Sequence, residues 1–188
     1  MKGTVSLSAL LPAVAAAVHP LPVIASGGIA TGRGLVAALS LGAQGVSVGT
    51  RFLASEEAFI PPEYKERILR SRAEDTVYCE LFDIGWPAPH RVLRNKAVAE
   101  WAATGRALPG HRPGEGTIIG TLPRGGKPLD VVRYSAMMPA SGFVGDLEYA
   151  ALYCGESCAL VNDIKPAAQI VRDMVREAEQ VIAEIRGA

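Results

Sequence analysis

The sequence predicts an α/β protein organised around a parallel sheet, on the evidence of two apolar runs and the helix between them. Residues 22–25 form a short apolar run, β-branched at its centre, which stops at Gly27 and Gly28, as expected of a strand buried on both faces. Residues 45–48 form a second such run, which Gly49 ends. Because so few residues separate the two runs, they make a right-handed βαβ crossover in one parallel sheet.

The segment between the two runs carries the signals of a helix. Thr31 is a residue type that caps helix N-termini, so we expect the helix to begin near Gly32. Val36 and Leu39 belong to its apolar face. Gly42 stands where a helix commonly ends on a left-handed residue.

Glycine at both strand ends gives this unit a predicted chemistry. Gly27, Gly28 and Gly49 leave backbone N–H groups uncovered, and a short helix expected near Thr50 adds further N–H groups that can approach an anion. Two neighbouring strand ends that hold one phosphate are typical of the last strands of many (β/α)8 barrels. A single Gly-Gly pair could equally be a tight turn. Two glycine-bearing strand ends one crossover apart favour a phosphate site.

Beyond residue 57 the βαβ pattern does not recur. Residues 62–72 are typical of a charged amphipathic helix, 76–82 have the composition of a strand, and 90–103 are expected to be a helix. Residues 145–153 are also expected to be helical. The clearest helix spans residues 165–186. We expect its whole apolar stripe to pack in the core, namely Ile170, Val171, Met174, Val175, Ala178, Val181, Ile182 and Ile185.

Composition narrows the class of protein. The 188 residues are 49% hydrophobic and 20% charged, which suits a globular chain able to bury a core. Nineteen basic and nineteen acidic residues cancel, so no net field favours nucleic acid or an anionic membrane as partner. No apolar run is long enough to span a bilayer. Three cysteines form no disulfide framework and no metal-ligand pattern, which predicts a cytoplasmic protein without a metal.

At residues 22–53 the chain closely resembles a known segment. PVIASGGIATGRGLVAALSLGAQGVSVGTRFL is similar to the FMN phosphate-binding segment of the nitronate monooxygenase family, formerly called 2-nitropropane dioxygenases. FMN-dependent enoyl-acyl-carrier-protein reductases share nearly the same segment. The resemblance continues through Leu10-Leu11-Pro12 upstream and through residues 153–157 to the terminal helix. It implies part of a (β/α)8 TIM barrel that binds FMN. The implied phosphate contacts are Gly27, Gly28, Ser47, Val48, Gly49 and Thr50.

A second group of implied flavin contacts lies near residue 155. In relatives a Gly-Gln-Ser stretch approaches the flavin, and Tyr153, Glu156 and Ser157 stand at and beside the matching positions. Glu156 departs from the family pattern. A carboxylate beside a phosphate repels it unless the carboxyl is protonated or paired with a cation such as Arg51. A connecting turn with Tyr153 in the core remains the alternative.

The resemblance also implies where the catalytic base should be. Relatives carry Gly-Gly-His-x-Gly-Thr before the Leu-Leu-Pro helix, and that histidine is the base. Here Gly3-Thr4 match the tail of the motif and Met1 falls at the histidine, so we expect the base upstream of Gly3. The chain would then be the C-terminal part of a barrel, through a truncated gene model, an internal start codon or an engineered truncation. The histidines present, His19, His90 and His111, are expected to have no catalytic role.

The resemblance implies a function and a division of the chain. Residues 1–56 are the barrel portion, 57–144 a mostly helical region that covers the substrate, and 145–188 a flavin-proximal turn and helix. The implied reaction oxidises a small alkyl nitronate with O2. The alternatives are an FMN- and NAD(P)H-dependent enoyl-acyl-carrier-protein reductase, or an inactive fragment or pseudoenzyme. Two strands without neighbours also leave apolar edge that self-association, such as a homo-oligomer, would cover.

Overall fold

The structure, a computed structural model, describes residue 3 and residues 5–187. These residues form two compact units, which are described separately. Unit 1 combines the residues up to Ala58 with those from Gly155 onward, and unit 2 is Phe59–Cys154. The positions expected to match the tail and the histidine of the catalytic motif, Thr4 and Met1, lie outside the described residues.

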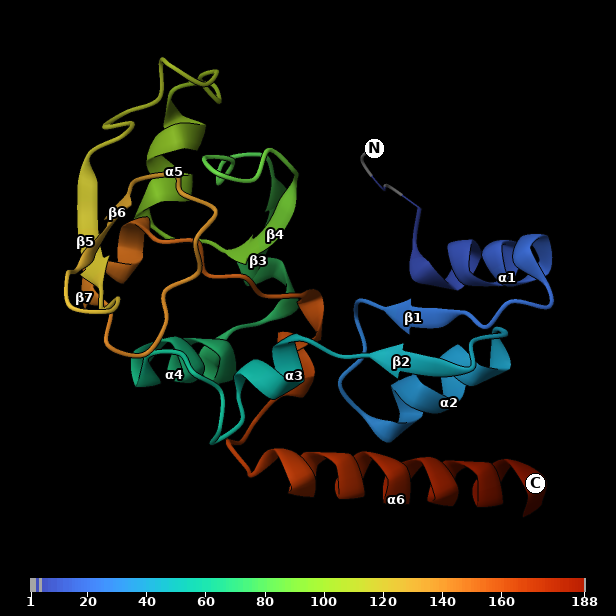
Figure 1. The fold of residues 1–188 in the computed structure, drawn as a ribbon. Coiled ribbons are helices and arrows are strands. Elements are labelled where there is room, and N and C mark those ends of the chain that lie inside the picture. The colour runs from blue at the N-terminus through green and yellow to red at the C-terminus, as the bar shows by residue number, and fades with distance from the viewer. Residues whose placement is uncertain (1–2, 4, 188) are drawn as a thin grey trace. The chain divides into compact units, whose positions relative to one another are not determined.

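Unit 1 is built on the predicted βαβ crossover (Figure 1). In chain order its elements are α1 (Leu7–Val18), β1 (Ile24–Ser26), α2 (Gly32–Ser40), β2 (Gly45–Ser47), α3 (Thr50–Leu53), the 3-10 helix η3 (Glu156–Leu160) and α6 (Ala167–Gly187). β1 and β2 pair in parallel, with Ile24 opposite Gly45 and Ser26 opposite Ser47. Figure 1 shows α2 between this strand pair and α6. The α/β prediction is confirmed, while the unit contains one strand pair and no closed barrel among its described residues.

Local signals account for the crossover helix. The Thr31 side chain accepts a hydrogen bond from the Gly34 N–H at 3.2 Å, so Thr31 is the N-cap as predicted. At the other end Gly42 has φ +99°, the left-handed conformation that glycine adopts without strain. The N-cap residue and the terminating glycine therefore determine where α2 begins and ends, and both can be recognised in the sequence.

The expectation that β1 is buried on both faces is wrong. Ala25 is 2% exposed and packs with Leu11, Ile29 and Ala38, whereas Ile24 is 58% exposed. Successive side chains of a strand point to opposite faces, and in the described part of unit 1 the core lies on only one of them. The sequence of β1 indicates a strand buried on both faces because both faces are apolar. In the described residues, only the face of Ala25 is covered.

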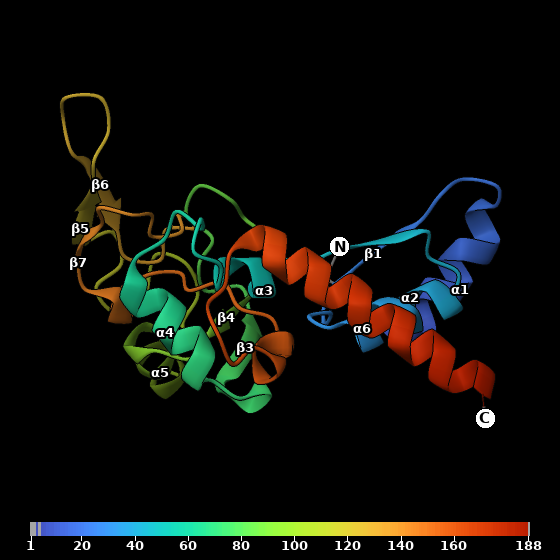
Figure 2. The same ribbon diagram turned by 90° about the horizontal axis from the view of Figure 1, so that it is seen from below.

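The apolar stripe of α6 is also only half covered. Ile170, Met174, Ala178 and Val181 are buried, and this side of α6 lies along α2, as Figure 2 shows from below. The remaining stripe residues are exposed, namely Val171, Val175, Ile182 and Ile185. The prediction that the whole stripe packs in the core is therefore wrong, because the described residues cover only one side of it.

Unit 2 is a mixed structure and not the mostly helical region that was expected. Its elements are α4 (Pro62–Arg70), the 3-10 helix η1 (Ala73–Asp75), β3 (Thr76–Cys79), β4 (His90–Leu93), α5 (Lys96–Ala103), β5 (Ile118–Leu122), β6 (Leu129–Val132), β7 (Val144–Gly145) and the 3-10 helix η2 (Leu147–Tyr149). β3 and β4 form an antiparallel pair, and β5 pairs with both β6 and β7.

Pairing between distant residues explains both wrong helix predictions in unit 2. Residues 90–93 pair with β3, and Asn95 then caps α5, so only the second part of the expected helix 90–103 is helical. Gly145 pairs with Gly120, and the Leu93 N–H donates to the Leu152 carbonyl at 2.8 Å. Of residues 145–153, only Leu147–Tyr149 are helical, as the 3-10 helix η2, and the residues on either side of it pair with strands instead.

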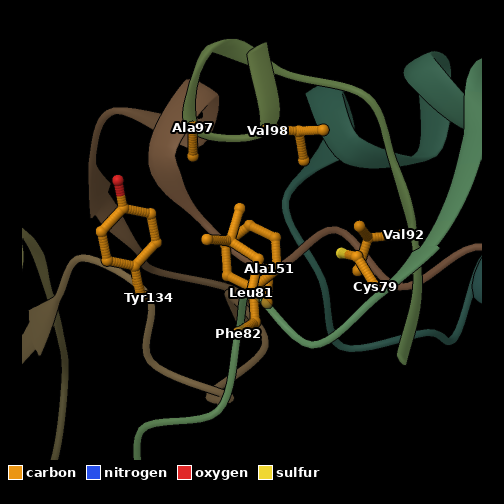
Figure 3. Packing of buried hydrophobic residues seen from close by; sticks show 8 residues of the cluster. All are labelled: Cys79, Leu81, Phe82, Val92, Ala97, Val98, Tyr134 and Ala151. Carbon is orange, nitrogen blue, oxygen red and sulfur yellow. The ribbon is translucent and has the colours of Figure 1, made fainter. Parts of the chain in front are cut away.

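The core of unit 2 gathers around Phe82, which is fully buried (Figure 3). Tyr134 lies beside it with a ring-centroid distance of 6.5 Å. The buried members of the cluster are Cys79, Leu81, Phe82, Val92, Ala97, Val98, Tyr134 and Ala151. They come from β3, β4, α5, the loop after β3 and the segments that follow β6 and η2, so this core joins distant parts of the unit.

None of the helices that the structure describes combines the length and the apolar character needed to cross a membrane.

Candidate functional site

The two glycine-bearing strand ends lie at the same edge of the sheet in unit 1. β1 and β2 are parallel, and Ser26 opposite Ser47 is their last matched pair. Gly27 and Gly28 follow β1 directly, and Gly49 follows β2 by two residues. The register therefore brings these glycines to neighbouring positions at the carboxyl edge, where ligands of open α/β sheets bind.

The space in front of the three glycines is open. Gly27 has φ +106° and Gly28 has φ +73°, conformations that other L-residues adopt only with strain. A Cβ atom added to Gly27, Gly28 or Gly49 would meet no other atom within 4 Å. Gly49 has φ −97°, so its backbone would accept a side chain. Because Gly49 has no side chain, the space that a Cβ atom would fill is open to an approaching ligand.

Thr50 connects this edge to the loop that carries the second group of predicted contacts. Thr50 is buried, and its Oγ1 accepts a hydrogen bond from the Gly155 N–H at 2.9 Å. A Cβ atom at Gly155 would lie 3.3 Å from that Oγ1 and 3.6 Å from the Oγ of Ser157, which is also buried. The structure thus brings Thr50, Gly155 and Ser157 together, whereas the Glu156 residue is exposed.

The other predicted contacts are placed less uniformly. Ser47, at the end of β2, is exposed, and Val48 is half-buried against the unit 1 core. Tyr153 belongs to unit 2, where its hydroxyl donates to the Ala136 carbonyl at 2.6 Å and burial raises its pKa. Its ring meets the His90 ring edge-on, with centroids 5.1 Å apart. Within unit 2, Tyr153 therefore has the core role that was the alternative interpretation.

The histidines occupy three separate settings. His19 follows α1 and leads toward the amino end of β1, opposite the glycine edge. His90 lies in β4 and not at a helix start, and no described group accepts or donates at its buried Nδ1. His111 is exposed in a loop of unit 2. Among the described residues, no three His, Cys, Asp or Glu side chains converge to hold a metal ion.

Sequence reasoning missed the surroundings of Arg51. The residue was expected to balance charge near the phosphate, but its guanidinium is buried and lies 3.0 Å from the Asp163 carboxylate. Asp163 is more than a hundred positions away in sequence, so no local signal could have indicated the pair.

Comparison with known proteins adds the family. The family described as nitronate monooxygenase matches residues 1–177. The chain belongs to the nitronate monooxygenase family. Nitronate monooxygenase npaC of Metarhizium robertsii is 32% identical over 94% of this chain and 47% of its own length.

Two further similarities concern part of the sequence and the fold. A (3aS,4S,5R,7aS)-5-hydroxy-7a-methyl-1-oxo-octahydro-1H-indene-4-carboxyl-CoA dehydrogenase of Mycobacterium tuberculosis is 43% identical over 56% of this chain and 29% of its own length. FabK from Thermotoga maritima superposes with a TM-score of 0.68 and 29% identity, covering 98% of this chain and 52% of FabK. Relatives that match nearly all of this chain are about twice as long, so the chain spans about half of their length.

Proposed function

We propose that this chain supplies the phosphate site of an FMN-dependent oxidoreductase on a (β/α)8 barrel, of which α1 to α3 form one part. The observation that carries the proposal is the open space at Gly27, Gly28 and Gly49, at the carboxyl ends of two neighbouring parallel strands. Backbone N–H groups at such an edge can surround a phosphate without a clash with side chains. Membership of the nitronate monooxygenase family and the resemblance of residues 22–53 support FMN as the phosphate-bearing group.

In this proposal each residue has a binding role. Gly27, Gly28, Ser47, Val48, Gly49 and Thr50 border the phosphate. Ser157 and Glu156 extend the border through the loop that Thr50 Oγ1 holds at Gly155. FMN, when bound, supplies the two-electron redox chemistry, and the protein binds and orients it. By resemblance, the position of the base that takes the proton α to the nitro group matches Met1, so that role falls to none of the binding residues named here.

The phosphate site predicts a difference between two flavins. FMN and riboflavin differ only in the phosphate, so the ratio of their dissociation constants isolates the phosphate contacts. Gly49→Val should lower FMN affinity about 10–100-fold, since each lost charged hydrogen bond costs about 1.5–3 kcal/mol. Riboflavin affinity should stay unchanged. Fluorescence titration of flavin with the protein measures both constants.

The matched control is Gly45→Ala, at the amino end of β2 and away from the carboxyl edge, where the atom nearest the added Cβ is the flexible end of Ile24. This variant should keep the wild-type ratio. If the wild-type protein binds FMN no more tightly than riboflavin, the phosphate assignment is wrong.

A thioester reductase is the second candidate, because the 43% identity over 56% of the chain is to an enzyme named for an acyl-CoA substrate. Two assays on the same preparation separate the candidates. O2 uptake with an alkyl nitronate and no NAD(P)H supports nitronate oxidation. NAD(P)H oxidation dependent on an enoyl thioester supports the reductase, and neither activity in FMN-loaded protein supports a pseudoenzyme.

A further inference from the structure

Arg51 is a buried charge next in sequence to the proposed phosphate contacts. It follows Thr50 in the chain and is only 6% exposed. Its Nη2 donates to the Asp163 carbonyl at 2.9 Å, lies 3.0 Å from Asp163 Oδ1, and reaches the Ala54 carbonyl at 3.4 Å. The guanidinium therefore contacts residue 163 and the C-terminal end of the short helix α3, which begins at Thr50.

The contact at Asp163 continues to the long helix of unit 1. Lys165 Nζ lies 3.0 Å from Asp163 Oδ2 and 3.0 Å from Asp173 Oδ2 in α6. The Lys165 carbonyl accepts the Glu56 N–H at 3.0 Å, so the backbone is joined at the same place. Alternating charges thus connect α3 to α6, and α6 in turn packs along α2.

These charged groups surround a cavity of about 190 Å³ in unit 1. On one side its lining includes Ala30 and Thr31, which follow the Gly27-Gly28 turn, and Arg51, which follows Gly49-Thr50. On the other side it includes Asp163, Lys165 and Asp173. The cavity is therefore in contact with both segments that lead away from the glycine edge. The Arg51 Nε–H is buried and meets no partner among the described residues.

We propose that Arg51 is a positioning residue for the phosphate site, and this inference rests on the function proposed above. Buried and held at Asp163, Arg51 fixes the orientation of the turn that carries the Gly49 and Thr50 N–H groups. Donors that are fixed before a charge arrives bind it more strongly than donors that must reorganise. Arg51 therefore contributes to phosphate affinity without touching the phosphate.

The test again uses the ratio of the riboflavin and FMN dissociation constants. Arg51→Met keeps a side chain of similar length but removes the hydrogen bonds that Arg51 donates to Asp163 and Ala54. We expect this variant to lower the ratio about 10-fold, equivalent to about 1.4 kcal/mol, and to leave riboflavin affinity within about twofold of wild type. Arg51→Lys retains the charge and one donor group and should recover part of the ratio.

Arg172→Met is the matched control, because it removes the same charge from an exposed site on α6, where the guanidinium donates to the Gln169 side chain. It should leave the ratio unchanged, which separates positioning from long-range charge. Asp163→Asn keeps the main-chain acceptor and should lower the ratio less than Arg51→Met does. If Arg51→Met does not fold, Asp163→Asn provides the test in its place.

The outcomes are distinct. A wild-type ratio of one overturns the phosphate site and this inference together. A clear wild-type preference for FMN that survives in Arg51→Met, or in Asp163→Asn if Arg51→Met does not fold, overturns the positioning role alone. Amide chemical shifts of Gly49 and Thr50 provide a second readout, since they should move with inorganic phosphate in wild type and move less in Arg51→Met.

Discussion

Arg112 shows how a single buried charge organises part of unit 2. Its Nη1 donates to the Leu81 carbonyl and to Asp83 Oδ1, each at 2.7 Å, and its guanidinium lies 4.8 Å from the centre of the Tyr134 ring. Its Nη2 pairs closely with Glu115. This hydrogen bond, with backbone donors at Gly110 and Arg112, lowers the pKa of Glu115 to about 2. Glu115 is therefore ionised in the folded protein well below the pH at which a free glutamate protonates.

The pKa of Glu115 gives a pH-dependent prediction. Because the folded-state pKa lies below the unfolded value of about 4.3, ionised Glu115 contributes stability that is complete above about pH 4.3 and is lost as the pH falls through about 2. Glu115→Gln should lower the free energy of unfolding at pH 7, and the difference from wild type should shrink between about pH 4.3 and 2. Urea unfolding at a series of pH values measures this difference.

The control for this prediction is Glu179→Gln, at an exposed carboxylate of α6. It should alter the free energy of unfolding little at any pH. A Glu115→Gln difference that is the same at pH 7 and pH 3 would show that the ion pair does not contribute through ionisation.

At the scale of elements, Gly32 sets how closely α2 and α6 approach. A Cβ atom at Gly32 would lie 2.4 Å from the Met174 carbonyl oxygen and 2.5 Å from the Ala178 nitrogen, both of them backbone atoms of α6. The Gly32 N–H also donates to Glu177 Oε2 at 2.7 Å. The helices can meet this closely only because position 32 has no side chain.

Gly32→Ala should therefore separate the helices and lower the free energy of unfolding by about 1–3 kcal/mol, the usual cost of overpacking. Gly34→Ala is the control within α2, since the atom nearest its Cβ is a side-chain methyl of Ile29 at 3.3 Å, which can move. Urea denaturation compares the two. Equal stability of the two variants would mean that the contact of α2 with α6 is not limiting.

Elements whose signals are local could be predicted from the sequence, and elements defined by distant partners could not. α2 has its cap at Thr31 and its terminating glycine at Gly42 within a dozen residues, and both are confirmed. The strand at 90–93 and the extended stretch around residue 152 depend on pairing that no local pattern shows. In the candidate site the glycines follow from strand ends, whereas the Arg51–Asp163 pair joins residues far apart in the chain.

On the scale of the whole molecule, apolar side chains remain exposed in unit 1. They lie on β1 and on the far part of the α6 stripe, at Ile24, Val171, Val175, Ile182 and Ile185. Contiguous exposed apolar surface favours association, and a two-stranded sheet retains unpaired edges. The described residues do not cover this apolar surface.

We expect the 188-residue chain to self-associate in a concentration-dependent manner. Val175→Lys combined with Ile182→Glu, at exposed positions of α6, should reduce that association without disturbing the buried face of the helix. Sedimentation velocity across about a hundredfold concentration range measures it. A wild-type chain that stays monomeric throughout would contradict the prediction.

Unit 1 is interrupted in sequence, and this has a consequence for how the protein is made. Glu57 accepts a hydrogen bond from the Ala167 N–H at 2.8 Å, so the start of α6 is bound by a residue that precedes all of unit 2. A ribosome adds about 5–20 residues per second, so several seconds pass between the synthesis of α2 and that of α6, which packs on it. During that interval Ala38 and Ala25 lack Ile170 and Met174 as neighbours. Unit 2 is then free to fold first, while the apolar face of β1 and α2 stays exposed as a surface that a chaperone can bind.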